Sequence, residues 1–528
     1  MTADWLTETR LIMALWAGVG LAALGYGFRR RNRPPSIDRQ ISIVSAAVGA
    51  VLLVLGIQAA RYAVFQQKAI AGRVGVDPGS EEVVANPRQS TSDLTAPRGA
   101  ILAADRSRIA WSEKTGSVYT RFYGDAALAP VAGYFSPLLY GKAGLESTWD
   151  SALTGEGGRS LLDRFAGRIG IAESGPLDVM LTIEPQLQQE AVRLLDGNTG
   201  AVVVLEPSTG AVLALASYPA VDPVPLAAVN QAQVQAARIA WDALLDDPDR
   251  PLVRRATEGL YPPGSTFKVV TAAVAIESGV AAPDTTYEDD GSLEIDGHLI
   301  VEANRPDETR AQWSLMEAFA YSLNVVFAQV GLQVGRHELE EGAGAFGIGR
   351  SVSFDEHVSA GQIASDDDFL ASQAALADTA FGQGELLVTP LHMAMVSSAV
   401  ANDGVMMRPY LVASLRDRTG GTVSTIEPEP LRAVIGQQTA NTLQGMMVNA
   451  VEWGYAGAAL LPGYRVGGKT GTAESGGEVP HGWFIGFAGE DEPRVAVAVV
   501  LEHGGEGGGY PAQIGAQLLE IALQNERP

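Results

Sequence analysis

Cysteine is absent from this sequence of 528 residues. Its absence excludes disulfide bonds, thiol nucleophiles and metal sites built from cysteine, and it is compatible with a location outside the cytoplasm. The six histidines form no His-x-x-x-His pair, so a zinc hydrolase is not expected. We therefore predict no metal site.

Basic charge is also scarce. The chain carries 37 Lys and Arg against 61 Asp and Glu, which gives a net charge of −24. A protein that binds nucleic acid needs a basic face to neutralise phosphates. The composition therefore argues against a nucleic-acid partner.

Lysine is the rarer of the two basic residues, with 32 Arg and five Lys among the 37. Arginine stays protonated in proteins, whereas a lysine amine can lose its proton when it is buried or lies near another cation. Beyond residue 143 the sequence keeps two lysines, Lys268 and Lys469. Chemistry that needs a neutral amine in this part of the chain would have to use these two positions.

Two apolar runs predict a membrane anchor over residues 1–60. The run 11–28 is slightly shorter than the roughly 20 residues that a bilayer core requires, and the run 40–60 is long enough to span. Five arginines in the loop between them mark that loop as cytoplasmic. We expect two transmembrane helices, with the chain after residue 60 on the extracytoplasmic side of the membrane.

Two alternatives remain open for this anchor. Four glycines weaken the first run, which could instead be a buried or interfacial helix. A cleaved signal peptide fits less well, because its positive charges should precede the first apolar run.

The rest of the sequence falls into two regions that differ in composition and in apolar pattern. Residues 61–176 are rich in turn signals and predict a small α+β module with a positioning role. Residues 177–528 begin with a helix near 186–195 and two apolar strands, continue with a helical middle from about 265 to 400, and end with strands and a last helix. Strands from both ends around a helical insert predict one antiparallel sheet covered by helices, hence an α+β fold.

One stretch, Tyr261-Pro262-Pro263-Gly264-Ser265-Thr266-Phe267-Lys268, combines a serine with one of the two scarce lysines. Helical spacing follows from Ser265 to Gly279, and residues three apart on a helix share a face. The Lys268 amine could therefore reach the Ser265 hydroxyl. A neutral amine beside a hydroxyl is one way to make serine nucleophilic.

Two further motifs follow in order. Ser322-Leu323-Asn324 lies between two helical stretches, where a loop would present both polar side chains. Gly468-Lys469-Thr470-Gly471-Thr472 lies on a predicted C-terminal strand and contains the other lysine. Each motif alone could be structural, as helix caps or as a solvated strand. Their joint occurrence favours a catalytic site.

The three motifs resemble those of penicillin-binding serine D,D-transpeptidases, which share Ser-x-x-Lys, Ser-x-Asn and Lys-Thr-Gly with serine β-lactamases. The resemblance runs from about residue 98 to the C-terminus. It is strongest to monofunctional class B proteins of the penicillin-binding protein A group. It implies a penicilloyl-serine transferase fold, with a five-stranded antiparallel sheet and a helical subdomain. Further matching segments are Arg98-Gly99-Ala100-Ile101, Gly144-Leu145-Glu146, Gly382-Gln383-Gly384 and Thr389-Pro390.

The resemblance also implies roles. Ser265 would attack the penultimate D-Ala of a stem peptide, Lys268 would act as base, with its pKa lowered by burial and by Lys469, and Ser322 would relay protons. Asn324 would hold the substrate amide. The terminal carboxylate would be bound by residues of the last motif. The backbone N–H groups of Ser265 and Thr472 would form the oxyanion hole. No cofactor is required. The substrate-binding set is Asn324, Thr470, Gly471 and Thr472, beside the catalytic set Ser265, Lys268, Ser322 and Lys469.

The implied substrates are peptidoglycan stem peptides on lipid-linked precursors, and β-lactams would acylate Ser265 as mimics of the donor. The implied partner is a glycan polymerase of the SEDS family, in cell elongation or in division. Three alternatives keep the same fold: a D,D-carboxypeptidase, a serine β-lactamase, and a β-lactam sensor or scaffold. The β-lactamase is disfavoured because neither Glu-x-x-Leu-Asn nor Tyr-Gly-Asn occurs in the sequence.

Overall fold

The computed structural model divides the chain into two units, residues 1–75 and 76–528. The structure describes residues 93–155, 175–366, 368–474 and 479–525, together with the backbone of two short strands, β1 (Gly75–Val76) and β2 (Val83–Val84). The predicted transmembrane segments 11–28 and 40–60 lie outside these ranges, so the anchor stays a prediction. Of the helices that the structure describes, none is long and apolar enough to cross a membrane.

The predicted antiparallel sheet is confirmed. It has five strands, contributed by both ends of the 177–528 region, and every residue of its β9 and β21 strands is buried. A strand buried along its whole length needs covering layers on both faces, which explains its continuous Val and Ala composition. In spatial order the strands are β10 (Val212–Tyr218), β9 (Gly200–Leu205), β21 (Val495–Leu501), β20 (His481–Gly489) and β19 (Arg465–Ala473).

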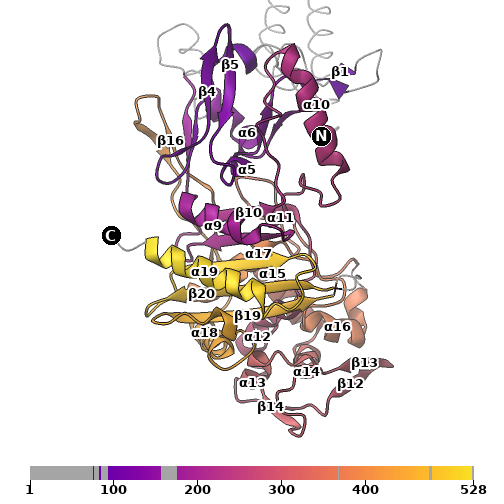
Figure 1. Ribbon diagram of the computed structural model, residues 1–528. Coiled ribbons are helices and arrows are strands. Elements are labelled where there is room, and N and C mark those ends of the chain that lie inside the picture. The colour runs from indigo at the N-terminus through magenta and orange to yellow at the C-terminus, as the bar shows by residue number, and fades with distance from the viewer. Residues whose placement is uncertain are drawn as a thin grey trace, which may run out of the picture. The chain divides into compact units, whose positions relative to one another are not determined.

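Helices cover this sheet, with a pair of helices from the two ends of the region on one face (Figure 1). Of that pair, the first helix starts at Pro185, where a proline costs no hydrogen bond, as the sequence predicts. A fully buried helix packs against β9, β20 and β21. The pair is α9 (Pro185–Leu195) and α19 (Tyr510–Asn525), the buried helix is α17 (Pro390–Ala401), and α11 (Arg255–Glu258) and α18 (Gln437–Glu452) also contact the sheet.

The helical middle holds short strands that the sequence analysis missed. Two of them form a hairpin whose turn residues Asp296 and Gly297 both have positive φ, at 52° and 83°. An Asp-Gly pair between short alternating segments is a hairpin signal. The predicted helical middle therefore also contains two short strand pairs. The elements are α12 (Lys268–Glu277), β11 (Thr286–Glu288), β12 (Ser292–Ile295), β13 (His298–Val301), β14 (Gln312–Ser314), α13 (Leu315–Ala320), α14 (Asn324–Val334), α15 (Arg336–Ala345) and α16 (Gln373–Ala380).

A second sheet of six strands combines the N-terminal part of the described chain, residues 93–155 and 175–181, with a late hairpin that contains β16 and β17. Its two strands from that hairpin follow α17 by more than ten positions, so the chain returns to the N-terminal part after building most of the helical middle (Figure 1). In spatial order the strands are β17 (Thr422–Thr425), β16 (Val412–Arg416), β8 (Asp178–Leu181), β3 (Ile101–Leu102), β4 (Arg108–Thr115) and β5 (Val118–Tyr123).

The N-terminal part is completed by short elements, and the rest of the chain adds one exposed helix and one small strand pair. These elements are α5 (Ala129–Ala132), β6 (Tyr134–Ser136), β7 (Gly141–Ala143), α6 (Leu145–Thr148), α7 (Asp150–Leu153), α10 (Gln231–Asp246), β15 (Val405–Met407) and β18 (Pro430–Ala433).

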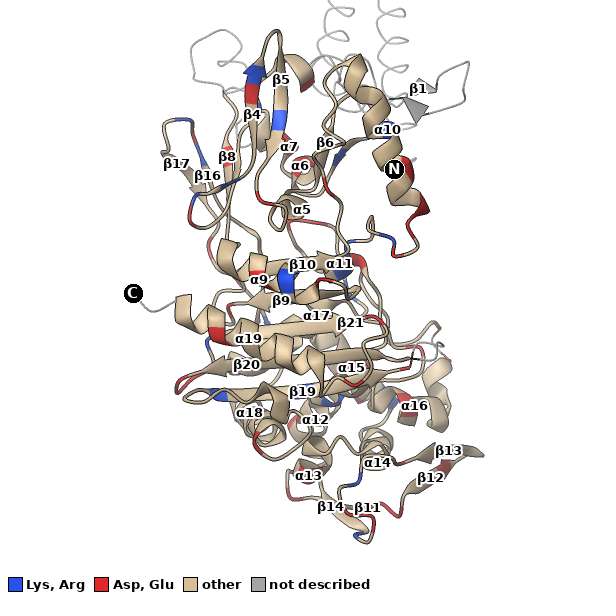
Figure 2. Cartoon of the chain, in the orientation of Figure 1, with Lys and Arg blue, Asp and Glu red and all other residues tan. Residues whose placement is uncertain are grey.

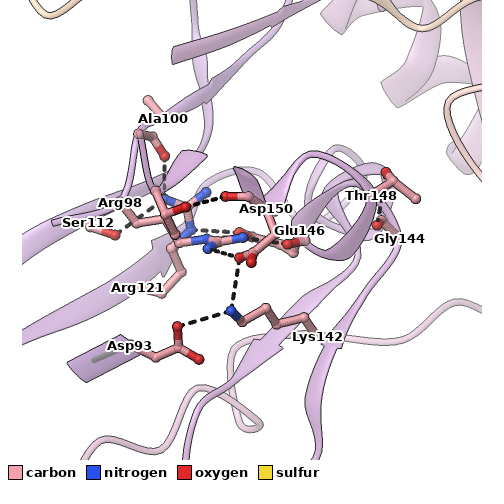
Figure 3. Close-up of polar contacts among 12 residues, drawn as sticks. Asp93, Arg98, Ala100, Ser112, Arg121, Lys142, Gly144, Glu146, Thr148 and Asp150 are labelled. Atoms are coloured by element: carbon pink, nitrogen blue, oxygen red, sulfur yellow. Dashed lines mark hydrogen bonds and ion pairs between the residues drawn. The ribbon is translucent and has the colours of Figure 1, made fainter. Parts of the chain in front are cut away.

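A buried ion cluster holds the N-terminal part together (Figure 3). Glu146 is fully buried and receives Arg98 Nε and Arg121 Nε, each at 2.6 Å. Burial alone would raise the pKa of Glu146, but the guanidiniums of Arg121 and Arg98 outweigh it and hold the pKa below its usual value. Asp150 joins Arg98 to Lys142, at 2.5 Å and 2.8 Å. The cluster therefore binds β5, α6, α7 and the Arg98 segment into one body.

Candidate active site

The turn that precedes Ser265 is fixed from several sides. Tyr261 exchanges backbone hydrogen bonds with Val388, at 3.0 Å and 2.9 Å, and the indole of Trp483 donates to Pro262 O at 3.0 Å. Gly264 has φ of 54°, and a Cβ there would lie 2.6 Å from Thr472 O. Only glycine fits both the conformation and the close approach.

The Pro-Pro-Gly turn delivers Ser265 to the mouth of a helix, as predicted. A 3-10 turn spans Gly264–Phe267, and α12 begins at Lys268, so the helix proper starts later than the predicted Ser265. Ser265 is half-buried, whereas Lys268 is fully buried. The predicted nucleophile therefore stays accessible while its lysine neighbour is removed from water.

The structure brings the second motif onto Lys268. Lys268 Nζ donates to Ser322 O at 2.6 Å and to Asn324 Oδ1 at 2.7 Å, and it lies 3.4 Å from Ser322 Oγ. Ser322 occupies the turn between α13 and α14 with φ of 61°, which is uncommon for a residue other than glycine. Strained backbone of this kind is typical of functional turns.

The third motif completes the constellation. Lys469 lies on β19 with 1% of its surface exposed, and its Nζ donates to Ser322 Oγ at 2.9 Å and to Thr470 O at 3.1 Å. The Ser322 hydroxyl therefore stands between two amines. Lysines 268 and 469 come together through a serine that is 54 positions from one and 147 from the other.

Strand β19 runs directly against the nucleophile turn. A Cβ on Gly471 would lie 2.8 Å from Pro263 O and 3.1 Å from the Thr266 backbone nitrogen, so a larger residue would push the strand away. Thr470 is mostly buried, whereas Thr472 is exposed and faces the accessible side of the strand. Of the predicted substrate-binding residues, Gly471 and Thr472 thus border the turn that carries Ser265, and Gly471 contributes its lack of a side chain.

Burial sets the state of both lysines. Desolvation lowers the pKa of Lys268 to about 7, although the charge of Glu302 opposes it. The pKa of Lys469 is lowered well below its usual value by burial and by the charge of Lys268. Burial is therefore the main cause at both sites, and the repulsion between the two amines adds to it.

Positive charge is otherwise dispersed over the fold. In the view of Figure 2, Lys and Arg are scattered among Asp and Glu and form no continuous basic stretch. Within the described ranges, no group of three or more His, Asp or Glu could hold a metal ion. The buried guanidiniums of Arg98 and Arg121 meet at the carboxylate of Glu146, whereas the buried amines of Lys268 and Lys469 meet at the hydroxyl of Ser322.

Three further residues lie beside the site and were not predicted from the sequence. Glu302 and Asn304 follow β13, and Tyr455 follows α18. Asn304 Nδ2 donates to Ser322 O at 3.1 Å, and the Tyr455 hydroxyl donates to Asn304 O at 2.7 Å. No spacing along the chain signals these contacts, because all three residues reach the Ser-x-Asn turn through tertiary packing.

Comparison with known proteins agrees with this geometry. The family model described as the penicillin-binding protein transpeptidase domain matches residues 200–520, and the model of the penicillin-binding protein A dimerisation domain matches residues 98–175. The chain is 38% identical over 468 residues to peptidoglycan D,D-transpeptidase PbpA of Mycolicibacterium smegmatis, covering 83% of this chain and 91% of the relative. It is 35% identical over 511 residues to PbpA of Mycobacterium tuberculosis, covering 92% and 98%.

Solved structures give the same result. The ceftriaxone and penicillin G acyl-enzyme complexes of penicillin-binding protein A from M. tuberculosis each match with a TM-score of 0.74 and 34% identity. The match covers 81% of this chain and 99–100% of those chains. The chain therefore belongs to the penicillin-binding D,D-transpeptidase family, and within it to the penicillin-binding protein A group.

Proposed function

We propose that this chain cross-links peptidoglycan stem peptides through an acyl-enzyme on Ser265. The observation that carries the proposal is the Ser322 hydroxyl, which lies 2.9 Å from Lys469 Nζ and 3.4 Å from Lys268 Nζ next to the nucleophile turn. A hydroxyl between two amines of lowered pKa can accept a proton from one group and donate one to another.

Acylation begins with Lys268. Its neutral amine takes the proton of Ser265 as the Oγ attacks the carbonyl carbon of the penultimate D-Ala. The Ser265 and Thr472 N–H groups stabilise the negative charge on the carbonyl oxygen. When the C–N bond breaks, the terminal D-Ala leaves with a proton passed from Lys268 through Ser322.

Deacylation runs the same route in reverse. The amine of a neighbouring stem peptide attacks the ester, loses a proton to the lysine–serine pair and releases Ser265. Water in place of this amine would give carboxypeptidase activity. The two reactions thus differ in the acceptor and share the acyl-enzyme.

The substrate is held from both sides of Ser265. Asn324 Oδ1 is occupied by Lys268, so its NH₂ group is left to donate to a carbonyl of the donor peptide. Thr470 and Thr472 offer hydroxyls to the terminal carboxylate, and Lys469 supplies the cation behind them. The incoming carboxylate raises the pKa of Lys469 again, so the substrate itself promotes the charged form that binds it.

The location and partner belong to the same proposal. The apolar runs 11–28 and 40–60 would anchor the chain in the bacterial cell membrane, with the active site on the extracytoplasmic face. A SEDS-family glycan polymerase would supply the nascent strands that carry the stem peptides.

Labelling with a fluorescent penicillin tests the function. We expect stable labelling of the wild type and none of Ser265→Ala. An unlabelled wild type would exclude the acyl-enzyme, and rapid release of the label would favour a β-lactamase. The protein is then incubated with lipid-linked precursor and a glycan polymerase, and the products are analysed. A transpeptidase would yield cross-linked dimers, whereas a carboxypeptidase would yield trimmed monomers. A sensor would be labelled but would produce neither.

A further inference from the structure

Glu302 holds the start of the helix that carries Asn324. It is 8% exposed, and both of its carboxylate oxygens accept backbone N–H groups. Oε2 accepts from Val325 at 3.0 Å, and Oε1 accepts from Asn304 at 2.9 Å. Val325 lies in the first turn of α14, where N–H groups have no partner within the helix and negative charge is favourable. The position of Asn324 thus depends on a carboxylate that belongs to none of the three motifs.

Asn304 extends this support to Ser322. The Ser322 carbonyl oxygen accepts from Asn304 Nδ2 at 3.1 Å and from Lys268 Nζ at 2.6 Å. On the outer side, the Tyr455 hydroxyl donates to Asn304 O at 2.7 Å. A chain of contacts therefore leads from an exposed tyrosine to the catalytic amine, and it stabilises the positive φ of Ser322.

Glu302 also bears the negative charge of the site. Two buried lysines are unfavourable without a counter-charge, since burial removes the water that would stabilise them. Among the titratable groups of the described structure, Lys469 on β19 shares the Ser322 hydroxyl with Lys268, and Glu302 after β13 acts on Lys268 and on Tyr455 after α18. Of these, Glu302 is the carboxylate, and its charge acts against the loss of the proton from Lys268.

We propose that Glu302 is the positioning residue of the Ser322–Asn324 turn and the counter-charge of Lys268, so that it sets the pH at which Lys268 becomes a base. The proposal rests on the proposed function, because it concerns the acylation step. A negative charge favours protonated Lys268. Its removal favours the neutral amine and extends acylation to lower pH.

Glu302→Gln tests the counter-charge on the full-length chain. The measurement is the acylation rate with a fluorescent penicillin between about pH 5 and pH 9, on either side of the Lys268 pKa of about 7. We expect the acidic limb of the rate profile to move to lower pH by roughly one unit. This is the lower end of the pKa change that a nearby opposite charge causes. The plateau should fall, because an amide cannot accept both N–H groups.

Three other variants make the test specific. Glu302→Asp keeps the charge and should keep the acidic limb of the wild type at a lower plateau. Glu288→Gln removes an exposed carboxylate of β11 and should change neither limb nor plateau. Tyr455→Phe removes the hydroxyl that holds Asn304 and should lower the rate several-fold at every pH without moving the limb.

The outcomes separate cleanly. The counter-charge role of Glu302 is overturned if the acidic limb of the pH–rate profile of Glu302→Gln coincides with that of the wild type. Circular dichroism must first show that the variant is folded. If Glu302→Gln does not fold, a displaced limb in Glu302→Asp overturns it instead. Tyr455→Phe at the wild-type rate overturns the bracing of the turn. A wild type that is not labelled at all contradicts the proposed function, not the role of Glu302 within it.

Discussion

Lys268 Nζ donates a 2.6 Å hydrogen bond to the backbone carbonyl of Ser322. The amine is thereby held by the second motif, and in the described structure no hydrogen bond joins it to the Ser265 hydroxyl three positions earlier. The position of the Lys268 amine is thus fixed by the Ser322–Asn324 turn and not by Ser265. Under the proposed mechanism, the hydrogen bond between Lys268 Nζ and the Ser265 hydroxyl forms when the substrate binds.

Replacing Lys268 by arginine should abolish the base while keeping a cation. Arginine does not lose its proton in proteins, and general base catalysis contributes typically about 10²–10⁴-fold. We expect the acylation rate to fall by about that factor, measured by stopped-flow fluorescence with a labelled penicillin. Lys114→Arg, at an exposed position of β4, is the matched control and should acylate normally. Normal acylation by Lys268→Arg would contradict the base role.

The acylation rate should rise with pH through about 7. Burial lowers the pKa of Lys268 to about 7, and the neutral amine is the active form, so the rate falls about tenfold for each pH unit below that value. With an ordinary lysine pKa the rate would instead keep rising up to about pH 10. The profile distinguishes the two cases, provided that circular dichroism shows an unchanged fold across the range. A flat profile between about pH 5 and pH 9 would rule out Lys268 as the titrating base.

Removing the Ser322 hydroxyl should slow acylation without unfolding the protein. Ser322→Ala deletes the group that lies 2.9 Å from Lys469 Nζ, while its backbone contacts to Lys268 and Asn304 remain. Loss of one proton-relay group corresponds to about 10²-fold or more. The rate constant for acylation and the melting temperature should be measured together. A loss of labelling that tracks a lower melting temperature would indicate a structural effect instead.

Substitution of Gly382 should be unfavourable because a side chain there has no room, in addition to the strain of its backbone conformation. Its φ is 92°, and a Cβ there would lie 1.8 Å from Gly264 O in the nucleophile turn. Gly420 has a similar φ of 85° but open space around it. We expect Gly382→Ala to lose most penicillin labelling and Gly420→Ala to retain it, although both pay the same conformational strain of about 1 kcal/mol. Equal labelling of the two would show that the close approach is unimportant.

Breaking the buried ion cluster should destabilise the N-terminal part. Glu146→Gln leaves Arg98 and Arg121 without their shared carboxylate, and removing one partner of a buried pair costs about 3–5 kcal/mol. The measurement is thermal unfolding of the full-length chain. Glu190→Gln breaks a solvent-exposed contact with Arg193 and should leave the unfolding temperature nearly unchanged. A Glu146→Gln variant as stable as the wild type would show that the cluster is dispensable.

The sequence was most informative where chemistry restricts residue choice. Lysine scarcity led to Lys268 and Lys469, and the structure joins them through Ser322. The sheet was predictable because its strands are continuously apolar. Glu302 and Tyr455 were not, since an isolated acid or tyrosine in a loop has no periodicity, and its partner is chosen by tertiary packing.

The β12–β13 hairpin was missed although the Asp296-Gly297 pair offered a local signal. The strands are only four residues long, too short for alternation to stand out within a mostly helical region. The return of β16 and β17 to the N-terminal sheet had no such signal, because strand pairing across some 230 positions leaves no mark on local sequence.

That return has a consequence for how the chain can be divided. A truncated protein that began at residue 177 would keep β8, β16 and β17 but lose β3, β4 and β5, leaving β8 as an exposed edge. Unpaired edges promote aggregation and strand exchange between molecules. The catalytic region is thus continuous in sequence but cannot be separated from the N-terminal part. A mechanical load applied to β3, β4 or β5 would reach it through β8 and β16 as well as through the chain itself.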